Sequence, residues 1–108
     1  MKQPDKFMKN TYKLSWSDEA LNNLKGIINY LEFNWTNREI KKFAQLLEKQ
    51  LKRIKENPLL FAESEKSNGL RRSVLSKQTT IYYRVNNNEI RIISLFDNRQ
   101  NPHKLINK

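Results

Sequence analysis

Two stretches in the first half of the chain place apolar residues three or four positions apart, which is the spacing of one face of a helix. Three stretches in the second half alternate apolar and polar residues, as a strand with one buried side does. A short alternating run, Thr11–Trp16, precedes them all, with Tyr12, Leu14 and Trp16 on one side. The pattern therefore predicts the element order β-α-α-β-β-β.

The first predicted helix begins after Ser17, a favourable N-cap residue, and carries Asp18 and Glu19 in its first turn, where the helix dipole favours acids. Its apolar stripe consists of Leu21, Leu24, Ile28, Leu31 and Trp35. We expect this stripe to be the buried face of the helix.

The second predicted helix begins at a capping box, Thr36 with Glu39 three residues later. It ends near Asn57, because Pro58 disfavours helical geometry in the residue before it. Its apolar stripe consists of Ile40, Phe43, Leu47, Leu51 and Ile54. Two helices with so short a joint predict an antiparallel hairpin, whose seam the apolar face of a sheet can cover.

The last third of the chain predicts a three-stranded antiparallel meander. Its strands are Leu70–Leu75, Thr79–Val85 and Glu89–Phe96, separated by clusters of Ser, Lys, Gln and Asn. We expect the connection residues Leu59, Leu60 and Phe61 to pack under this sheet. The predicted fold class is α+β: two layers, with the helix hairpin on one face of a mainly antiparallel four-stranded sheet. The neighbour of the first strand cannot be read from the sequence.

A chain of 108 residues has room for one modest core. We expect a flexible segment at 1–10, a single domain at 11–105 and a tail at 106–108, and the native start is open between Met1 and Met8. The chain has no cysteine, which excludes a disulfide framework and permits a reducing cytoplasm. From the polar first ten residues and the lack of a long apolar run we expect neither a signal peptide nor a membrane span, and with a single His we expect no metal and no cofactor.

The net charge of the chain indicates the class of partner that it binds. The net charge is +10, and residues 70–108 hold 8 Lys and Arg against 2 Asp and Glu, a net of +6. Arginines held on rigid strands suit an anionic partner, either a nucleic acid or an acidic protein.

A family resemblance rests on short motifs in a fixed order. Leu70-Arg71-Arg72 opens a strand, Ile81-Tyr82-Tyr83-Arg84-Val85 forms the next, and Ile90–Phe96 leads into Asn98-Arg99 and Pro102. With the helix hairpin that ends in Asn57-Pro58, this order resembles the RelE/ParE superfamily of bacterial type II toxins over roughly residues 11–105. The resemblance implies a small cytoplasmic toxin, related to plasmid stabilisation proteins, that an acidic cognate antitoxin wraps and neutralises in a hetero-oligomer.

The resemblance leaves the mechanism open between two branches. ParE-like members act on DNA gyrase by binding, and the Leu-Arg-Arg and Tyr-Tyr-Arg segments suit that branch. RelE-like members are endoribonucleases that cut mRNA in the ribosomal A site. A third alternative is a degenerate member that binds its partner without being toxic. We expect the ParE-like reading.

The candidate target- or antitoxin-binding residues are Arg71, Arg72, Tyr82, Arg84, Arg91, Asn98 and Arg99. In the nuclease alternative Arg71, Arg84 and Arg99 would bind the phosphate, but His103, the single imidazole, sits in the tail and leaves the general base unassigned.

Strand alternation refines the expectations for the candidate residues. If Ile81, Tyr83 and Val85 face the helices, then Tyr82 and Arg84 face outward, where Tyr82 could stack on a partner. We hypothesise that acidic side chains of the antitoxin pair with Arg84 and Arg91. Asp97 is expected to accept backbone N–H groups in a turn. The lysines of the second helix are read as a solvated face, with a gyrase- or nucleic-acid-binding stripe as the alternative.

Overall fold

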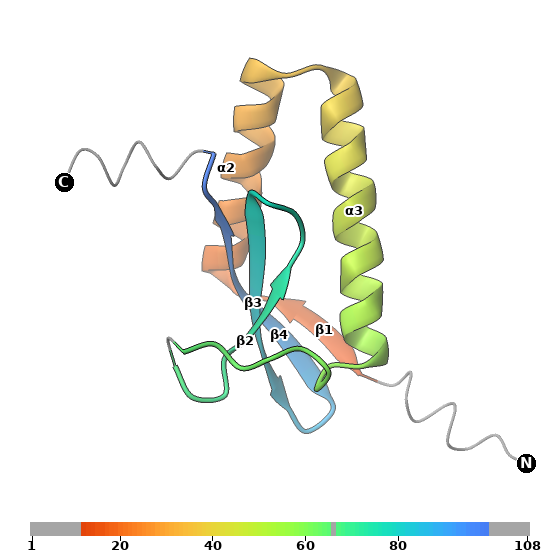
Figure 1. Ribbon diagram of the computed structural model, residues 1–108, viewed down its shortest axis with the longest axis vertical. Helices are drawn as coiled ribbons and strands as arrows, with labels where there is room; N and C mark the ends of the chain where they lie inside the picture. Colours follow the sequence, from red (N-terminus) through yellow and green to blue (C-terminus); the bar gives the residue numbers. More distant parts are fainter. Residues whose placement is uncertain (1–11, 66, 100–108) are drawn as a thin grey trace, which may run out of the picture.

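The computed structural model describes residues 12–65 and 67–99, and it contains every element of the predicted order (Figure 1). The elements are β1 (Lys13–Trp16), α2 (Asp18–Asn34), α3 (Asn37–Glu56), β2 (Arg71–Val74), β3 (Thr79–Asn86) and β4 (Glu89–Asp97). The predictions for Thr11, His103 and the segments 1–10 and 106–108 lie outside the described residues.

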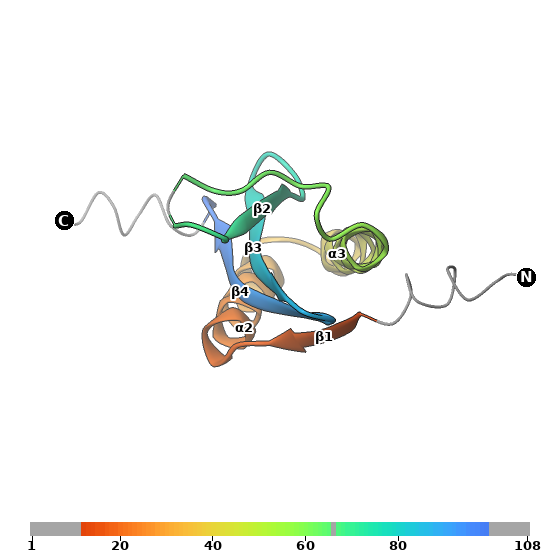
Figure 2. The ribbon, with the colours of Figure 1, turned by 90° about the horizontal axis from the view of Figure 1, so that it is seen from below.

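The four strands form one mixed sheet in the order β1-β4-β3-β2. The meander β2-β3-β4 is antiparallel, as predicted, whereas β1 runs parallel to β4 at one edge. A two-residue turn, in which Asn87 takes a left-handed φ of 56°, joins β3 to β4. Figures 1 and 2 show the two helices side by side as a hairpin against the sheet.

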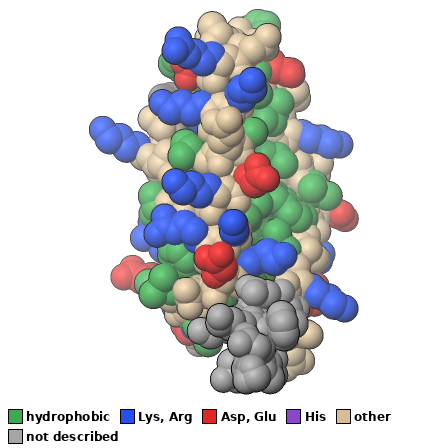
Figure 3. Space-filling view, turned by 90° about the vertical axis from the view of Figure 1, so that its right-hand side faces the viewer, with side chains coloured by type: hydrophobic (Ala, Val, Ile, Leu, Met, Phe, Trp, Pro, Cys, Tyr) green, Lys and Arg blue, Asp and Glu red, His purple; other side chains and the backbone are tan. Residues whose placement is uncertain are grey.

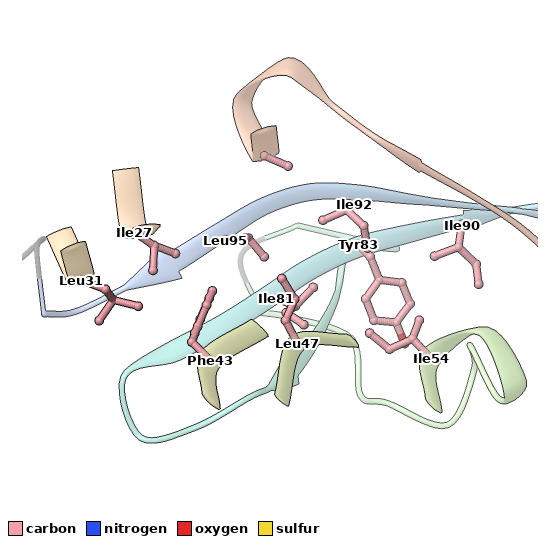
Figure 4. Close-up of a cluster of buried hydrophobic side chains, with 11 residues drawn as sticks. Ile27, Leu31, Phe43, Leu47, Ile54, Ile81, Tyr83, Ile90, Ile92 and Leu95 are labelled. Atoms are coloured by element: carbon pink, nitrogen blue, oxygen red, sulfur yellow. The ribbon is translucent and has the colours of Figure 1, made fainter. Parts of the chain in front are cut away.

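The core lies between the helix hairpin and one face of the sheet. Figure 4 shows Tyr83 of β3 directed toward Ile54 of α3, and Ile81 of the same strand beside Leu47. The buried cluster comprises Ala20, Ile27, Leu31, Phe43, Leu47, Ile54, Ile81, Tyr83, Ile90, Ile92 and Leu95. The predicted stripe of α3 is thus confirmed, since Phe43, Leu47 and Ile54 are buried and its other two members are partly buried.

The predicted stripe of α2 is only partly right. Leu21 and Trp35 are 44% and 48% exposed, while Ala20 and Ile27 are buried. The buried face of α2 is rotated toward β4 because its first turn is fixed there: the Ser17 N–H bonds to the Ile92 carbonyl. Apolar spacing marks a broad face of a helix, and the attachment of its first turn selects which edge of that face is buried.

Two local expectations fail. Leu59 and Leu60 are 61% and 70% exposed, and only Phe61 packs on the core. The Pro58 carbonyl accepts a hydrogen bond from the Tyr83 hydroxyl, and the chain leaves α3 with the side chains of the next two residues in solvent. Thr36 stands at the N-cap position of α3, but its side chain makes no capping hydrogen bond. The predicted capping box is therefore absent.

The two N-caps provide a matched test. Ser17 Oγ accepts the Ala20 N–H and donates to the Ile93 carbonyl at 2.7 Å. Replacing Ser17 with alanine should therefore lower the free energy of unfolding by about 2 kcal/mol. Thr36→Ala, which removes no capping bond, should cost no more than about 0.5 kcal/mol. Urea denaturation followed by circular dichroism measures both values, and equal losses would contradict the assignment.

Candidate functional site

Strand register places four of the candidate residues on the sheet face that carries none of the core side chains. Arg84 lies directly opposite Arg91, and Arg72 lies opposite Tyr82. Residues paired in this way point to the same side of a sheet. Ile81 and Tyr83 point to the helix side, as predicted, so Arg72, Tyr82, Arg84 and Arg91 share the other side. We call this side the arginine face.

Arg84 and Arg91 are paired on the two central strands of the arginine face, and their guanidiniums reach toward opposite edges of the sheet. The Arg84 guanidinium donates to the Asn68 carbonyl at 2.7 Å and to Ser67 Oγ at 2.9 Å. The Arg91 guanidinium is exposed and donates to Ser15 Oγ at 3.1 Å. Within residues 12–65 and 67–99, neither guanidinium has a carboxylate partner. An acidic group bound on this face would therefore meet two cations that no described carboxylate neutralises.

Tyr82 is not the exposed stacking ring that the sequence predicts. Its side chain lies on the face away from the helices, as expected, but the residue is only 8% exposed. Alternation along a strand specifies the face on which a side chain lies and not what covers that face. Here Arg84 holds the turn at residues 67–69 against the arginine face, and Gly69 approaches so closely that an added Cβ would lie 3.2 Å from the Arg84 guanidinium.

Arg71 lies on the helix side and acts within the fold. Its guanidinium donates to the Phe61 carbonyl at 2.6 Å and stands 3.9 Å from the Glu63 carboxylate. It thus ties the connection after α3 to the edge of the sheet. Close by, the buried Tyr83 hydroxyl donates to the Pro58 carbonyl at 2.6 Å. Burial raises the pKa of Tyr83 to about 12, against a smaller opposing effect of the Arg71 charge.

Arg99 and Asn98 close the other end of the sheet. Asp97 accepts the Arg99 backbone N–H at 2.8 Å, which confirms the predicted turn, and its other oxygen holds the Arg99 guanidinium at 2.8 Å. Hydrogen bonding to Asp97 raises the pKa of Arg99. The Asn98 N–H donates to the Gln78 carbonyl at 2.9 Å. Both residues therefore fasten the end of β4.

The three arginines of the nuclease alternative do not converge. Arg71 binds the chain just after the end of α3, whereas Arg99 lines a cavity with Glu39 from the first turn of that helix. A 20-residue helix is roughly 30 Å long, so these two guanidiniums belong to opposite ends of the molecule. Arg84 lies on the opposite face from Arg71. A single phosphate cannot contact all three.

Two further hollows lie beside α3. One is an apolar cavity of about 270 Å³ along the helix hairpin, lined by residues that include Leu24, Ile28 and Leu51. Figure 3 shows apolar side chains running along this side, with Lys and Arg side chains beside them. The other is a cleft of about 530 Å³ between α3 and β2, where Lys49 and Arg53 meet Arg72. Sequence reasoning assigned these α3 cations to a solvated face. Lys49 and Arg53 are four residues apart and so lie on one side of the helix, which is the sequence feature that could have indicated a shared cationic site.

Two further observations bear on the class of protein. No helix in the described part of the chain is long and apolar enough to cross a membrane. Across the same residues, no three His, Cys, Asp or Glu side chains come together as metal ligands would.

Solved structures place this fold among the toxins of toxin–antitoxin systems. A chain of the chromosomal ParDE system of P. aeruginosa superposes with a TM-score of 0.69 at 22% identity, covering 82% of this chain and 97% of that one. A YoeB–YefM complex from Staphylococcus aureus gives a TM-score of 0.55 at 25% identity, covering 79% and 94%. The E. coli DinJ–YafQ toxin–antitoxin complex gives 0.59 at 9% identity, covering 82% and 94%. The fold is thus that of the RelE/ParE-type toxins.

The sequence itself settles the family. The model of the ParE toxin of the type II toxin–antitoxin system parDE matches residues 14–102. The chain therefore belongs to the ParE toxin family, as its motifs predict. A search of curated proteins gives no match.

Proposed function

We propose that this ParE-family toxin acts in the cytoplasm by binding DNA gyrase and inhibiting it without cutting RNA. A cognate antitoxin neutralises it in a hetero-oligomer. The family match and the likeness to chains from toxin–antitoxin complexes support the antitoxin partner. The separation of Arg71, Arg84 and Arg99 supports inhibition by binding over RNA cleavage, because cleavage needs several cations around one phosphate in the transition state. Binding needs only a surface of defined charge.

In this proposal the arginine face is the surface that contacts the target. Arg84 is already held by the Asn68 carbonyl and Ser67, so this side chain loses little further freedom when an acidic group binds. Arg72 extends the positive charge toward the β2 edge of the same face. Arg71, Asn98 and Arg99 support the fold that presents these groups.

Induction of the toxin alone in bacterial cells separates the mechanisms. We expect the DNA damage response to rise while mRNA stays intact, and co-expression of the protein encoded in the neighbouring reading frame should restore growth. Messenger RNA cut at codon boundaries would contradict the proposal and support the RelE-like alternative. Normal growth without the partner would indicate a degenerate, non-toxic member.

A supercoiling assay with purified gyrase tests the arginine face directly. Arg91→Glu should raise the toxin concentration needed for half-inhibition at least about tenfold, since one well-placed charge contact is worth more than 1.4 kcal/mol. The variant should remain folded, because residue 91 is exposed and a glutamate there lies on the strand next to Arg84 without adding a like charge. Lys52→Glu on exposed α3 makes the same change in net charge and should shift inhibition less than about threefold. Equal effects of the two variants would contradict this location.

A further inference from the structure

The cleft between α3 and β2 combines an apolar floor with a positive rim. Its lining residues are Leu46, Lys49, Gln50, Arg53, Phe61, Ala62, Arg72, Val74 and Leu75. Three of them are cations and none is an acid, so the cleft carries a local formal charge of +3. Leu46 and Val74 are 39% and 54% exposed there. An apolar surface ringed by cations suits an acidic segment that carries apolar side chains.

The outer edge of β2 adds a directional feature to this cleft. The Leu75 N–H bonds inward to the Thr79 carbonyl of the β2–β3 hairpin, whereas the Arg72 N–H points outward to the Ala62 carbonyl. Because N–H directions alternate along a strand, the Val74 N–H also points outward. Over the described residues it has no acceptor.

The chain itself already pairs with the first half of this edge. Residues Ala62 to Ser64 lie alongside Leu70 to Arg72, with a bridge between Glu63 and Arg71, and then turn away. The second half of β2 is left as an open edge over the cleft. An exposed edge is a ready template for an extended peptide, which would obtain backbone bonds from the edge and specificity from the adjoining pockets.

We infer that this cleft binds an extended acidic segment of the antitoxin, which docks along Val74 and places an apolar side chain on the Leu46–Phe61 floor. Its carboxylates meet Lys49, Arg53 and Arg72. This inference rests on the proposed toxin function and moves the antitoxin contact from Arg84 and Arg91 to the β2 edge. Arg84 and Arg91 then stay available for the target while Arg72 borders both surfaces, and the two contacts can be separated by mutating residues other than Arg72.

The test uses the full-length toxin and the protein encoded in the neighbouring reading frame, with affinity measured by calorimetry. The double variant Lys49→Glu and Arg53→Glu inverts the cleft charge and should weaken binding at least 30-fold. Lys41→Glu with Lys52→Glu makes the same charge change on α3 outside the cleft lining and should weaken binding less than threefold. Thermal melts followed by circular dichroism check that all variants are folded.

Hydrogen exchange of the complex locates the contact independently. The Val74 amide should exchange at least tenfold more slowly when the partner is bound, and tiled peptides of the partner should show binding confined to an acidic stretch. Binding that is unaffected by cleft inversion, or binding that Arg91→Glu weakens while the Val74 amide gains no protection, would overturn the inference and leave the proposed function standing. Failure of the wild-type toxin to bind this protein would overturn both.

Discussion

Replacing Asp97 with alanine should lower the free energy of unfolding by about 3 kcal/mol. The Asp97 carboxylate is 2% exposed and accepts hydrogen bonds from the Thr79 hydroxyl and from the Arg99 guanidinium and backbone N–H. Removing it leaves the fully buried Thr79 hydroxyl without this acceptor. Because Arg99 is partly exposed and water can screen its charge, the expected loss is at the low end of the range for a broken buried ion pair.

Two variants bracket this effect. Thr79→Val removes one hydrogen bond to the same carboxylate without emptying the site and should cost about 1 kcal/mol. Asn98→Ala changes the adjacent residue, whose exposed amide makes only a 3.3 Å bond to the Lys77 carbonyl, and should cost less than about 0.5 kcal/mol. Urea denaturation gives all three values. A loss for Asp97→Ala no larger than that for Asn98→Ala would show that the carboxylate does not hold the end of β4.

The second large effect is a loss of stability in alkali that depends on Tyr83. Burial raises the pKa of its hydroxyl from 10.0 to about 12, so the folded state holds this proton more tightly than the unfolded state. Stability from this difference is complete below pH 10 and falls as the pH rises through about 12. A shift of this size corresponds to about 2–3 kcal/mol.

The Tyr83→Phe variant isolates this contribution from the lysines, which titrate in the same range. At neutral pH it should be about 1 kcal/mol less stable, because it loses the bond to the Pro58 carbonyl. Above pH 10 that deficit should shrink, and it should reverse near pH 11, since phenylalanine has no proton to lose. Unfolding free energies of both proteins, measured at intervals from pH 7 to pH 12, check the crossing. A difference that is constant across this range would contradict the role assigned to burial.

The sequence was sufficient for features that depend on neighbouring residues. Ser17 begins a helix because an N-cap needs only a side-chain oxygen and the N–H groups that follow it. Apolar periodicity selected the buried face of α3, and alternation placed Ile81 and Tyr83 on the helix side. These rules act within a few residues, so one chain contains all the information they need.

The sequence was not sufficient for contacts between distant segments. The partner of β1 is set by the path of the intervening helix hairpin, and no pattern within Lys13–Trp16 encodes a parallel pairing with β4. Arg71 and Arg84 look alike as strand arginines, yet one binds the Phe61 carbonyl inside the fold and the other lies on the arginine face. Register separates them, and register is a property of the assembled sheet.

The sequence therefore predicted which residue types make up the candidate site, and the structure showed how those residues are arranged. The excess of positive charge and the family motifs identified the class of protein. They could not indicate that Arg99 is paired with Asp97, or that Lys49 and Arg53 meet Arg72 across a cleft. The same holds for Tyr82: the sequence predicted the sheet face on which its side chain lies, but not that this side chain would be buried there.

The pairing of β1 with β4 has a consequence for the moment at which the toxin becomes active. A ribosome makes β1 first among the four strands, and its partner, about 75 residues later, is made last. A nascent chain that has not yet released residues 89–97 lacks both the centre of the sheet and Arg91. The arginine face, proposed above to bind the target, is thus incomplete until β4 has left the ribosome, so an antitoxin already present in the cell can meet the toxin as it folds.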